Sequence, residues 1–459
     1  MEVNLESPLP ASLPVGKATA IFCFGSCTHD VERIQLVVDG VRHPVAAFGM
    51  PRPDLGNELT GFWGTVPVTP HEAPGAVELE AAIGLPDGRE TLAPLGRVAV
   101  VEPSPPPPFE VPSPDMIAIC MATFEPDMDL FRAQVESLRA QTYEHWICLV
   151  SDDCSAPEQF EQITDVIGSD TRFVVSRSEV RRGFYRNFER ALEMVPAGVR
   201  LVALCDHDDR WYPEKLQVLH YSLGSAQLVY SDQRLLDIDG RVLRDTLWSG
   251  RRNNHTDLAS LLVANSITGA ASLFRREVMQ AALPFPDPPG IDFHDHWIGL
   301  VALASGDVAY VDRPLYDYVQ HRGAVFGEVT QGPKPSLRSR LRGWRAAYFC
   351  GYMQREVQAQ ALLARLGDRL TGKKRRVLER YVAAQRSLPA FAWLAARSLR
   401  RFAGRSETLG SESELAQGIL WKWMIELRSR LPGRRLSDAS FPDPMSFQQR
   451  RLRRWRARV

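Results

Sequence analysis

The feature that most constrains the fold is an alternation of short apolar runs with helical stripes, which begins near residue 117. Ile117–Met121, Trp146–Val150 and Leu201–Cys205 are apolar runs of strand length. Between the first two runs, Phe131 and Val135 recur at helical spacing. Strands that alternate with helices indicate an α/β domain with a mainly parallel sheet. In such sheets ligands bind beyond the carboxyl ends of the strands, so we expect the chemistry in the loops that follow them.

A proline-rich segment separates this domain from a different pattern before it. Seven of the twelve residues in Pro103–Pro114 are proline, a composition that favours an extended, semi-rigid spacer. Before the spacer, apolar residues alternate with polar ones in short runs, as over Ile34–Val38, and the turn sequence Asp39-Gly40 follows. Several short strands separated by turns suggest a small β-sandwich.

After about Pro333 the strand pattern disappears, and Arg-rich stretches with Leu, Ala and Trp replace it. We therefore expect four segments along the chain. They are an N-terminal β-sandwich-like domain (1–102), a Pro-rich linker (103–114), the α/β domain (115–332) and an Arg-rich helical region (333–459).

The formal net charge of zero, from 55 basic and 55 acidic residues, conceals an uneven distribution. Residues 1–330 carry 26 basic and 46 acidic side chains, whereas residues 331–459 carry 29 basic and 9 acidic ones. This asymmetry excludes one uniform domain. It also suggests that the C-terminal end has a polyanionic or membrane-surface partner.

The basic C-terminal region favours an anionic membrane surface. Six of the residues 450–458 are arginine, interleaved with Leu452 and Trp455, and such basic stretches with Trp and Leu suit anionic lipid. Two alternatives remain open: docking onto the acidic body or another subunit, and nucleic-acid binding. No apolar run approaches the roughly 18–20 residues of a membrane span, and the N-terminus lacks the features of a signal peptide. The expected location is cytoplasmic and peripheral, at the inner face of the membrane.

The strongest local signal is the run Leu201–Trp211, in which an apolar strand ends in Asp206, Asp208 and Asp209. Crowded carboxylates cost free energy unless a cation neutralises them. Their hard oxygen atoms suit Mg²⁺ or Mn²⁺, and such an ion could hold a diphosphate. The alternative is a solvated acidic turn.

Two further carboxylates occupy comparable positions. Asp153 follows the apolar run Ile147–Val150 and could accept hydrogen bonds from a base or a ribose, although helix N-capping stays open. Asp295 stands between His294 and His296, ahead of an apolar helical stretch. It is either a helix cap or a general base that removes a proton from an acceptor hydroxyl.

Taken in order, these motifs resemble those of the GT-A glycosyltransferases of family 2, the kind related to rhamnosyltransferases of bacterial surface polysaccharides. The resemblance covers the chain from about Met116 to Gly327 and implies a Rossmann-like GT-A catalytic domain. The stretches that carry it, in chain order, are IAICMATFEP, VSDDCS, RRGFYRNFERAL, CDHDDRW, ITGAASLFRR, HDHW and YVQHRG.

The resemblance also implies roles for individual residues. It makes Asp295 the catalytic base, and Asp208 and His321 the metal ligands, with Mn²⁺ or Mg²⁺ as the cofactor. The nucleotide-sugar contacts that it implies are Thr123, Glu125, Asp153, Arg182, Gly183, Asn187, Asp206, Gly269 and His321.

The activity that the resemblance implies is an inverting transfer of a sugar from a nucleotide-sugar donor to a saccharide or lipid-linked acceptor, in bacterial cell-surface polysaccharide synthesis. Two other classes remain open. One is a non-catalytic carbohydrate-binding or scaffold protein with a GT-A-like domain, and the other is nucleic-acid binding through the basic tail. Aromatic residues of the N-terminal domain, such as Phe48, Phe62 and Trp63, either fill its core or stack on a glycan.

Overall fold

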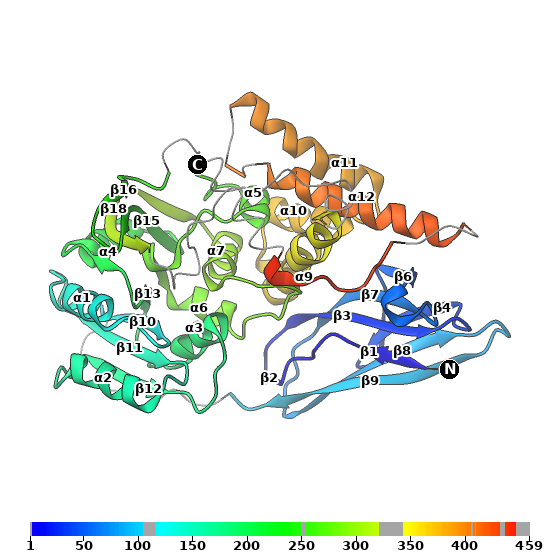
Figure 1. The fold of residues 1–459 in the computed structure, drawn as a ribbon, viewed down its shortest axis with the longest axis horizontal. Coiled ribbons are helices and arrows are strands. Elements are labelled where there is room, and N and C mark those ends of the chain that lie inside the picture. Colours follow the sequence, from blue (N-terminus) through cyan, green and yellow to red (C-terminus); the bar gives the residue numbers. More distant parts are fainter. Residues whose placement is uncertain are drawn as a thin grey trace. The chain divides into compact units, whose positions relative to one another are not determined.

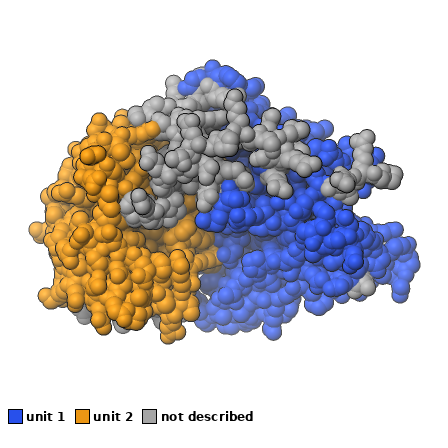
Figure 2. All heavy atoms as spheres, viewed as in Figure 1, with its two compact units in different colours: residues 1–103, 286–291, 331–458 blue, residues 104–285, 292–330, 459 orange. Residues whose placement is uncertain are grey.

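The computed structural model divides the chain into two compact units (Figures 1 and 2). Unit 1 consists of residues 1–103, 286–291 and 331–458, and unit 2 of residues 104–285, 292–330 and 459. The N-terminal strands and the C-terminal helices therefore belong to one unit, although the α/β domain separates them in the sequence. The residues that the structure describes are 2–103, 115–248, 253–320, 343–404, 407–408, 410–431 and 437–446. Most of the proline-rich segment, His321 and the arginines of 450–458 lie outside them.

The N-terminal part of unit 1 is a β-sandwich, as its alternating pattern predicts. One sheet has the order β1 (Val3–Leu5), β3 (Thr19–Thr28), β7 (Leu59–Val68) and β6 (Ala47–Pro51). The other has the order β2 (Ser12–Pro14), β9 (Glu90–Val101), β8 (Gly75–Gly84), β4 (Arg33–Val38) and β5 (Val41–Pro44).

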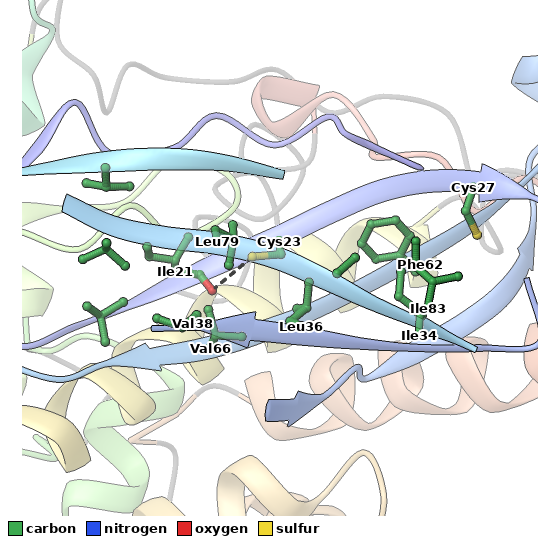
Figure 3. Packing of buried hydrophobic residues seen from close by; sticks show 14 of the residues in the cluster. Ile21, Cys23, Cys27, Ile34, Leu36, Val38, Phe62, Val66, Leu79 and Ile83 are labelled. Carbon is green, nitrogen blue, oxygen red and sulfur yellow. Dashed lines mark hydrogen bonds between the residues drawn. The ribbon is translucent and has the colours of Figure 1, made fainter. Parts of the chain in front are cut away.

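The core between the two sheets is built from alternate residues of their strands (Figure 3). Leu79 and Ile83 from β8 are buried in one cluster with Ile21 from β3 and Phe62 from β7. Because side chains alternate across a strand, each such strand places every second residue in this core.

The C-terminal region of unit 1 is helical over its described residues. A π-helical turn, η3 (Tyr348–Met353), leads into α9 (Gln354–Leu366) and the turn η4 (Gly367–Arg369). The helices α10 (Gly372–Ala383), α11 (Leu388–Arg397) and α12 (Ser411–Ser429) follow, with the 3₁₀ segment η5 (Ser398–Ala403) between the last two.

These helices pack against the first sheet through aromatic side chains. The Trp63 indole N–H of β7 donates a hydrogen bond to the Tyr348 hydroxyl at 2.9 Å, and the rings of Phe24 and Phe349 lie 5.7 Å apart. Phe62 and Trp63 are fully buried, one in the sandwich core and the other under the helices. Neither of these two rings can therefore stack on a glycan in this conformation.

Unit 2 is an α/β domain with a mixed sheet in the order β12, β11, β10, β13, β17, β15, β18, β14, and β16 pairs with β15. The four strands β10 to β13 are parallel to one another, as the sequence predicts, and β17 runs antiparallel beside β13. The strands, in chain order, are β10 (Ile117–Thr123), β11 (Trp146–Asp152), β12 (Phe173–Arg177), β13 (Leu201–Asp206), β14 (Arg210–Trp211), β15 (Leu228–Asp237), β16 (Val242–Arg244), β17 (Ser272–Arg275) and β18 (Val308–Gln320).

Helices connect these strands and complete the domain. They are α1 (Met128–Arg139), α2 (Pro157–Ile167), α3 (Phe184–Glu193), α4 (Lys215–Leu223), α5 (Leu258–Val263), α6 (Arg276–Ala282) and α7 (His294–Ser305), with the 3₁₀ turn η2 (Gly269–Ala271) before β17. The α/β prediction is confirmed. Within the described ranges of both units, no helix combines the length and apolarity needed to cross a membrane.

The packing of unit 1 can be tested at Gly418, where α12 passes close to the backbone of η3. A Cβ atom on Gly418 would lie 2.7 Å from the backbone nitrogen of Tyr348. Gly418→Ala is therefore expected to lower the free energy of unfolding by about 1–3 kcal/mol, as overpacking does. Chemical denaturation measures the change. The matched control is Gly343→Ala, because a Cβ atom on Gly343 meets nothing within 4 Å; equal stability of the two variants would contradict the packing.

Candidate active site

The carboxyl ends of three parallel strands meet at one edge of the unit 2 sheet. Thr123 of β10 is in register with Asp152 of β11, and Ala122 is in register with Asp206 of β13. The loops that follow β10 and β11 contain Glu125 and Cys154, whose φ angles are 43° and 66°. Positive φ values are uncommon for residues other than glycine, and they often occur at functional loops.

Asn187 of α3 fastens the ends of β10 and β11 together. Its side-chain amide donates hydrogen bonds to the carbonyl oxygens of Thr123, at 3.1 Å, and Ser151, at 2.9 Å. Its own oxygen accepts a hydrogen bond from the Ser151 hydroxyl at 2.6 Å. Asn187, which the sequence predicts as a nucleotide contact, is buried. Its side-chain oxygen and nitrogen are hydrogen-bonded to residues of β10 and β11.

Asp153 holds the loop that begins α3. Its two carboxylate oxygens accept hydrogen bonds from the backbone N–H groups of Arg182, at 2.6 Å, and Gly183, at 2.8 Å. Gly183 has a φ of 81°, which glycine adopts without strain. A carboxylate has further lone pairs, so these two bonds leave Asp153 able to accept another hydrogen bond.

Glu125 joins the loop after β10 to the start of α2. Its carboxylate accepts the backbone N–H of Ala156 at 2.7 Å, and its own N–H donates to the Ser155 hydroxyl at 2.9 Å. The structure thus connects one group of residues through hydrogen bonds between these loops: Thr123, Glu125, Asp153, Arg182, Gly183 and Asn187. Their contacts with a nucleotide stay a prediction.

The carboxyl groups of the acidic turn after β13 are largely shielded from water. Burial, and then the charge of Asp208, raise the pKa of Asp206 to about 7. Asp209 is only 1% exposed, and its pKa is also raised by burial. Within the described ranges, neither carboxylate oxygen of Asp209 has a hydrogen-bond partner of ordinary geometry.

The oxygen atoms of these carboxylates are of the type that binds divalent cations, but they do not form a complete set of ligands. Among the residues that the structure describes, no group of three or more His, Cys, Asp or Glu side chains is arranged to hold a metal ion. Mg²⁺ is often bound by one or two carboxylates together with substrate phosphates and water. Asp206 and Asp208 fit that mode. His321, the other predicted ligand, lies outside the described residues.

Asp295 and Gly269 lie side by side at the start of α7. A Cβ atom on Gly269 would be 3.3 Å from the Asp295 Cβ and 2.8 Å from the His294 Nε2, so glycine permits this close approach. Burial, followed by the charges of Asp206 and Asp292, raises the pKa of Asp295 to about 7. The effect of Asp206 on Asp295 indicates that the acidic turn and the start of α7 share one region.

His294 is a packing residue of this region. Its ring stacks on Phe188 with 3.7 Å between centroids, and burial lowers its pKa to about 3, so the imidazole is neutral at physiological pH. Sequence reasoning also passed over Lys215, the first residue of α4, which is fully buried. The residues around a lysine do not predict that it is buried, because most lysines are exposed.

A parallel sheet with an acidic turn at its carboxyl edge and an aspartate at a helix start defines an α/β domain with a candidate ligand site. Residues 119–282 match glycosyl transferase family 2, the family that the order of the motifs predicts. The match covers about a third of the chain. Asp295 lies beyond the matched residues.

The similarity to individual proteins is distant. "Uncharacterized protein y4gI" of Sinorhizobium fredii (strain NBRC 101917 / NGR234) is 28% identical over 122 residues, which are 26% of this chain and 13% of that protein. The chain thus spans a small part of the length of this relative.

Two solved structures show a partial similarity to this chain in the course of the backbone. S. aureus TarS 1–349 in complex with UDP-GlcNAc is 13% identical with a TM-score of 0.39, covering 71% of this chain and 97% of that one. The mannosyltransferase PcManGT from Pyrobaculum calidifontis, in complex with GDP-Man and Mn²⁺, is 16% identical with a TM-score of 0.36, covering 70% and 90%. At these values the similarity assigns no substrate or residue role to this chain.

The bridging role of Asn187 leads to a stability prediction. Asn187→Asp replaces the amide donor with a carboxylate that faces the carbonyl oxygens of Thr123 and Ser151. The expected loss in free energy of unfolding is about 2–3 kcal/mol, since a buried carboxylate oxygen then faces two carbonyl oxygens without a donor between them. Chemical denaturation measures it. The matched control is Asn57→Asp, at an exposed position of unit 1, with an expected change below about 0.5 kcal/mol. Similar losses in both variants would refute the bridge.

Proposed function

We propose that the chain is a glycosyltransferase. It transfers a hexosyl or rhamnosyl group from a nucleotide-sugar donor to a saccharide or lipid-linked acceptor in bacterial cell-surface polysaccharide synthesis. The observation that carries the proposal is the gathering of Asp206, Gly269 and Asp295 in a domain whose residues 119–282 match family 2. A scaffold function would not require three carboxylates with raised pKa values in one region.

The proposed reaction is a single displacement with inversion. The acceptor hydroxyl oxygen forms a bond to the anomeric carbon while the bond from that carbon to the diphosphate oxygen breaks. Asp295 accepts the hydroxyl proton, and the electron pair of the broken bond leaves with the nucleoside diphosphate. A pKa of about 7 suits this task, because a general base is most effective when its pKa lies near the working pH.

The remaining residues would bind the donor. Asp153 and the Arg182–Gly183 loop would contact the nucleoside, together with Thr123 and Glu125. Asp206 would lie at the ribose, and Asp208 would be the ligand of a divalent ion. When bound, Mn²⁺ or Mg²⁺ would supply positive charge that stabilises the departing diphosphate.

The decisive experiment separates binding from transfer. Purified protein is incubated with UDP-, dTDP- and GDP-sugars, Mn²⁺ or Mg²⁺ and candidate acceptors, and nucleotide release is measured. Asp295→Asn is expected to retain donor binding and to lose transfer by about 10²–10⁴-fold, the usual contribution of a positioned base. Below about pH 7, the kcat/KM of the wild type should fall about tenfold per pH unit, because Asp295 becomes protonated.

Two results would count against this proposal. Absence of binding and turnover with every donor would remove the enzyme function. Unchanged transfer by Asp295→Asn would remove Asp295 as the base. Asp312→Asn is the matched control, because Asp312 is an exposed aspartate of the same unit.

We also propose that unit 1 binds an anionic membrane surface, through a stripe of apolar residues on α11 and η5. Leu388, Ala392 and Ala396 are four residues apart and share one helix face, and Leu399 and Phe402 are three apart within the 3₁₀ segment. Leu388, Leu399 and Phe402 are 70%, 60% and 73% exposed.

Charge supports a lipid partner for this apolar stripe rather than a second copy of the chain. Residues 372–404 contain nine basic side chains and one acidic side chain. Two such surfaces would repel each other, whereas anionic lipid attracts them, and Leu and Phe can enter the headgroup boundary.

The apolar stripe predicts a specific loss of membrane binding. Leu399→Asp/Phe402→Asp should reduce flotation with phosphatidylcholine vesicles that contain phosphatidylglycerol by at least about fivefold. The double variant adds two negative charges and removes the apolar side chains that would enter the headgroup boundary. Val41→Asp/Leu92→Asp, at exposed positions of unit 1, is the control for charge. Equal flotation of both variants would refute the proposal, as would a wild type that self-associates without binding vesicles. Point substitutions are preferable to deletion of 433–459, since Phe441 packs 5.6 Å from Phe349.

A further inference from the structure

Lys215 is the most unusual charged residue of unit 2. It is the first residue of α4, it has no exposed surface, and it follows the acidic turn by six residues. Burying an ammonium group is costly unless other groups replace the lost water. The contacts that replace this water indicate what the residue does.

Three groups surround the ammonium of Lys215. Nζ donates a hydrogen bond to the carbonyl oxygen of Ala270, in the turn η2 that contains Gly269. The same atom lies 3.5 Å from the ring centroid of Trp211 and 4.3 Å from that of Tyr316. Aromatic faces attract cations, and the attraction grows when water is excluded.

Nearby carboxylates compensate the charge in part. Burial lowers the pKa of Lys215 to about 7, while Cys205, Asp209 and Asp206 act in the opposite direction. In return, the charge of Lys215 opposes the rise in the pKa values of Asp206 and Asp209 that burial causes. The contacts themselves join two segments: Trp211 belongs to β14, which directly follows the acidic turn, and Ala270 belongs to η2.

We propose that Lys215 is a positioning residue that ties β14, which closes the acidic turn 206–209, to the glycine turn 269–271, so that both turns present a single donor site. We call this link between β14 and η2 the clamp; it follows from the contacts of Lys215 with Trp211 and Ala270, whereas its effect on donor binding rests on the proposed function. A residue that only filled space here would be replaceable by an apolar one, since buried charges are often exchanged for apolar groups without loss of stability.

The clamp is tested first without any ligand. Lys215→Met keeps the length and apolar stem of the side chain but removes the donor. Amide hydrogen exchange of residues 269–272 is expected to accelerate about tenfold or more, as the loss of a charge-assisted hydrogen bond implies. Exchange in β12 should not change. Lys422→Met is the matched control, because Lys422 is a buried lysine of unit 1.

Donor binding is tested with UDP, dTDP and GDP, each with Mn²⁺, by titration calorimetry. In Lys215→Met the dissociation constant of the nucleotide that the wild type binds should rise about tenfold or more, while Lys422→Met stays within about twofold. The thermal midpoint is measured in parallel. If Lys215→Met loses its cooperative transition, Lys215→Leu takes its place with the same expectation, since neither side chain has a hydrogen-bond donor.

The two measurements separate the two ideas. Unchanged exchange in residues 269–272 would overturn the clamp whatever the nucleotides do. Accelerated exchange with unchanged nucleotide binding would overturn the effect on the donor site. A wild type that binds none of UDP, dTDP and GDP in any tested condition would count against the proposed function, and the exchange measurement would still decide the clamp.

Discussion

The parallel register of β10, β11 and β13 is the constraint on which the candidate site depends. Because these strands end level with one another, Thr123, Asp152 and Asp206 reach the same edge of the sheet. Asn187 then holds two of the strand ends through buried hydrogen bonds. Residues that are distant in the sequence become neighbours for this reason, and the loops that carry Asp153 and Glu125 start from fixed positions.

The second constraint is electrostatic. The same edge collects carboxylates that burial makes hard to ionise, and Asp206 and Asp295 both have pKa values raised to about 7. A protein tolerates such a cluster where a cation compensates it or where catalysis uses it. Lys215 supplies one positive charge from within the fold. In the proposed reaction, a divalent ion would compensate the charge of the acidic turn, and Asp295 would take up the proton of the acceptor hydroxyl.

Unit 1 changes the meaning of the charge asymmetry. Part of the basic C-terminal region is a structural partner of the N-terminal sandwich: Tyr348 and Phe349 cover Trp63 and Phe24, and Trp421 packs 5.8 Å from Phe349. Most aromatic residues of these helices therefore pack against other side chains of unit 1. The apolar stripe of α11 and η5 is exposed amid a strong excess of arginine and lysine, and Leu420 and Leu427 of α12 are exposed too.

The sequence by itself determined the α/β class of unit 2, the sandwich of the N-terminal domain and the motifs at the strand ends. Periodicity depends on local backbone geometry, so it can be read from neighbouring residues. Only the tertiary structure decided that Asn187 and Asp153 bond to the backbone, that Gly269 touches Asp295 and that Lys215 is buried. It also decided that the first and last parts of the chain share one unit. These are contacts between distant segments, and no local pattern encodes which partner a buried polar group will find.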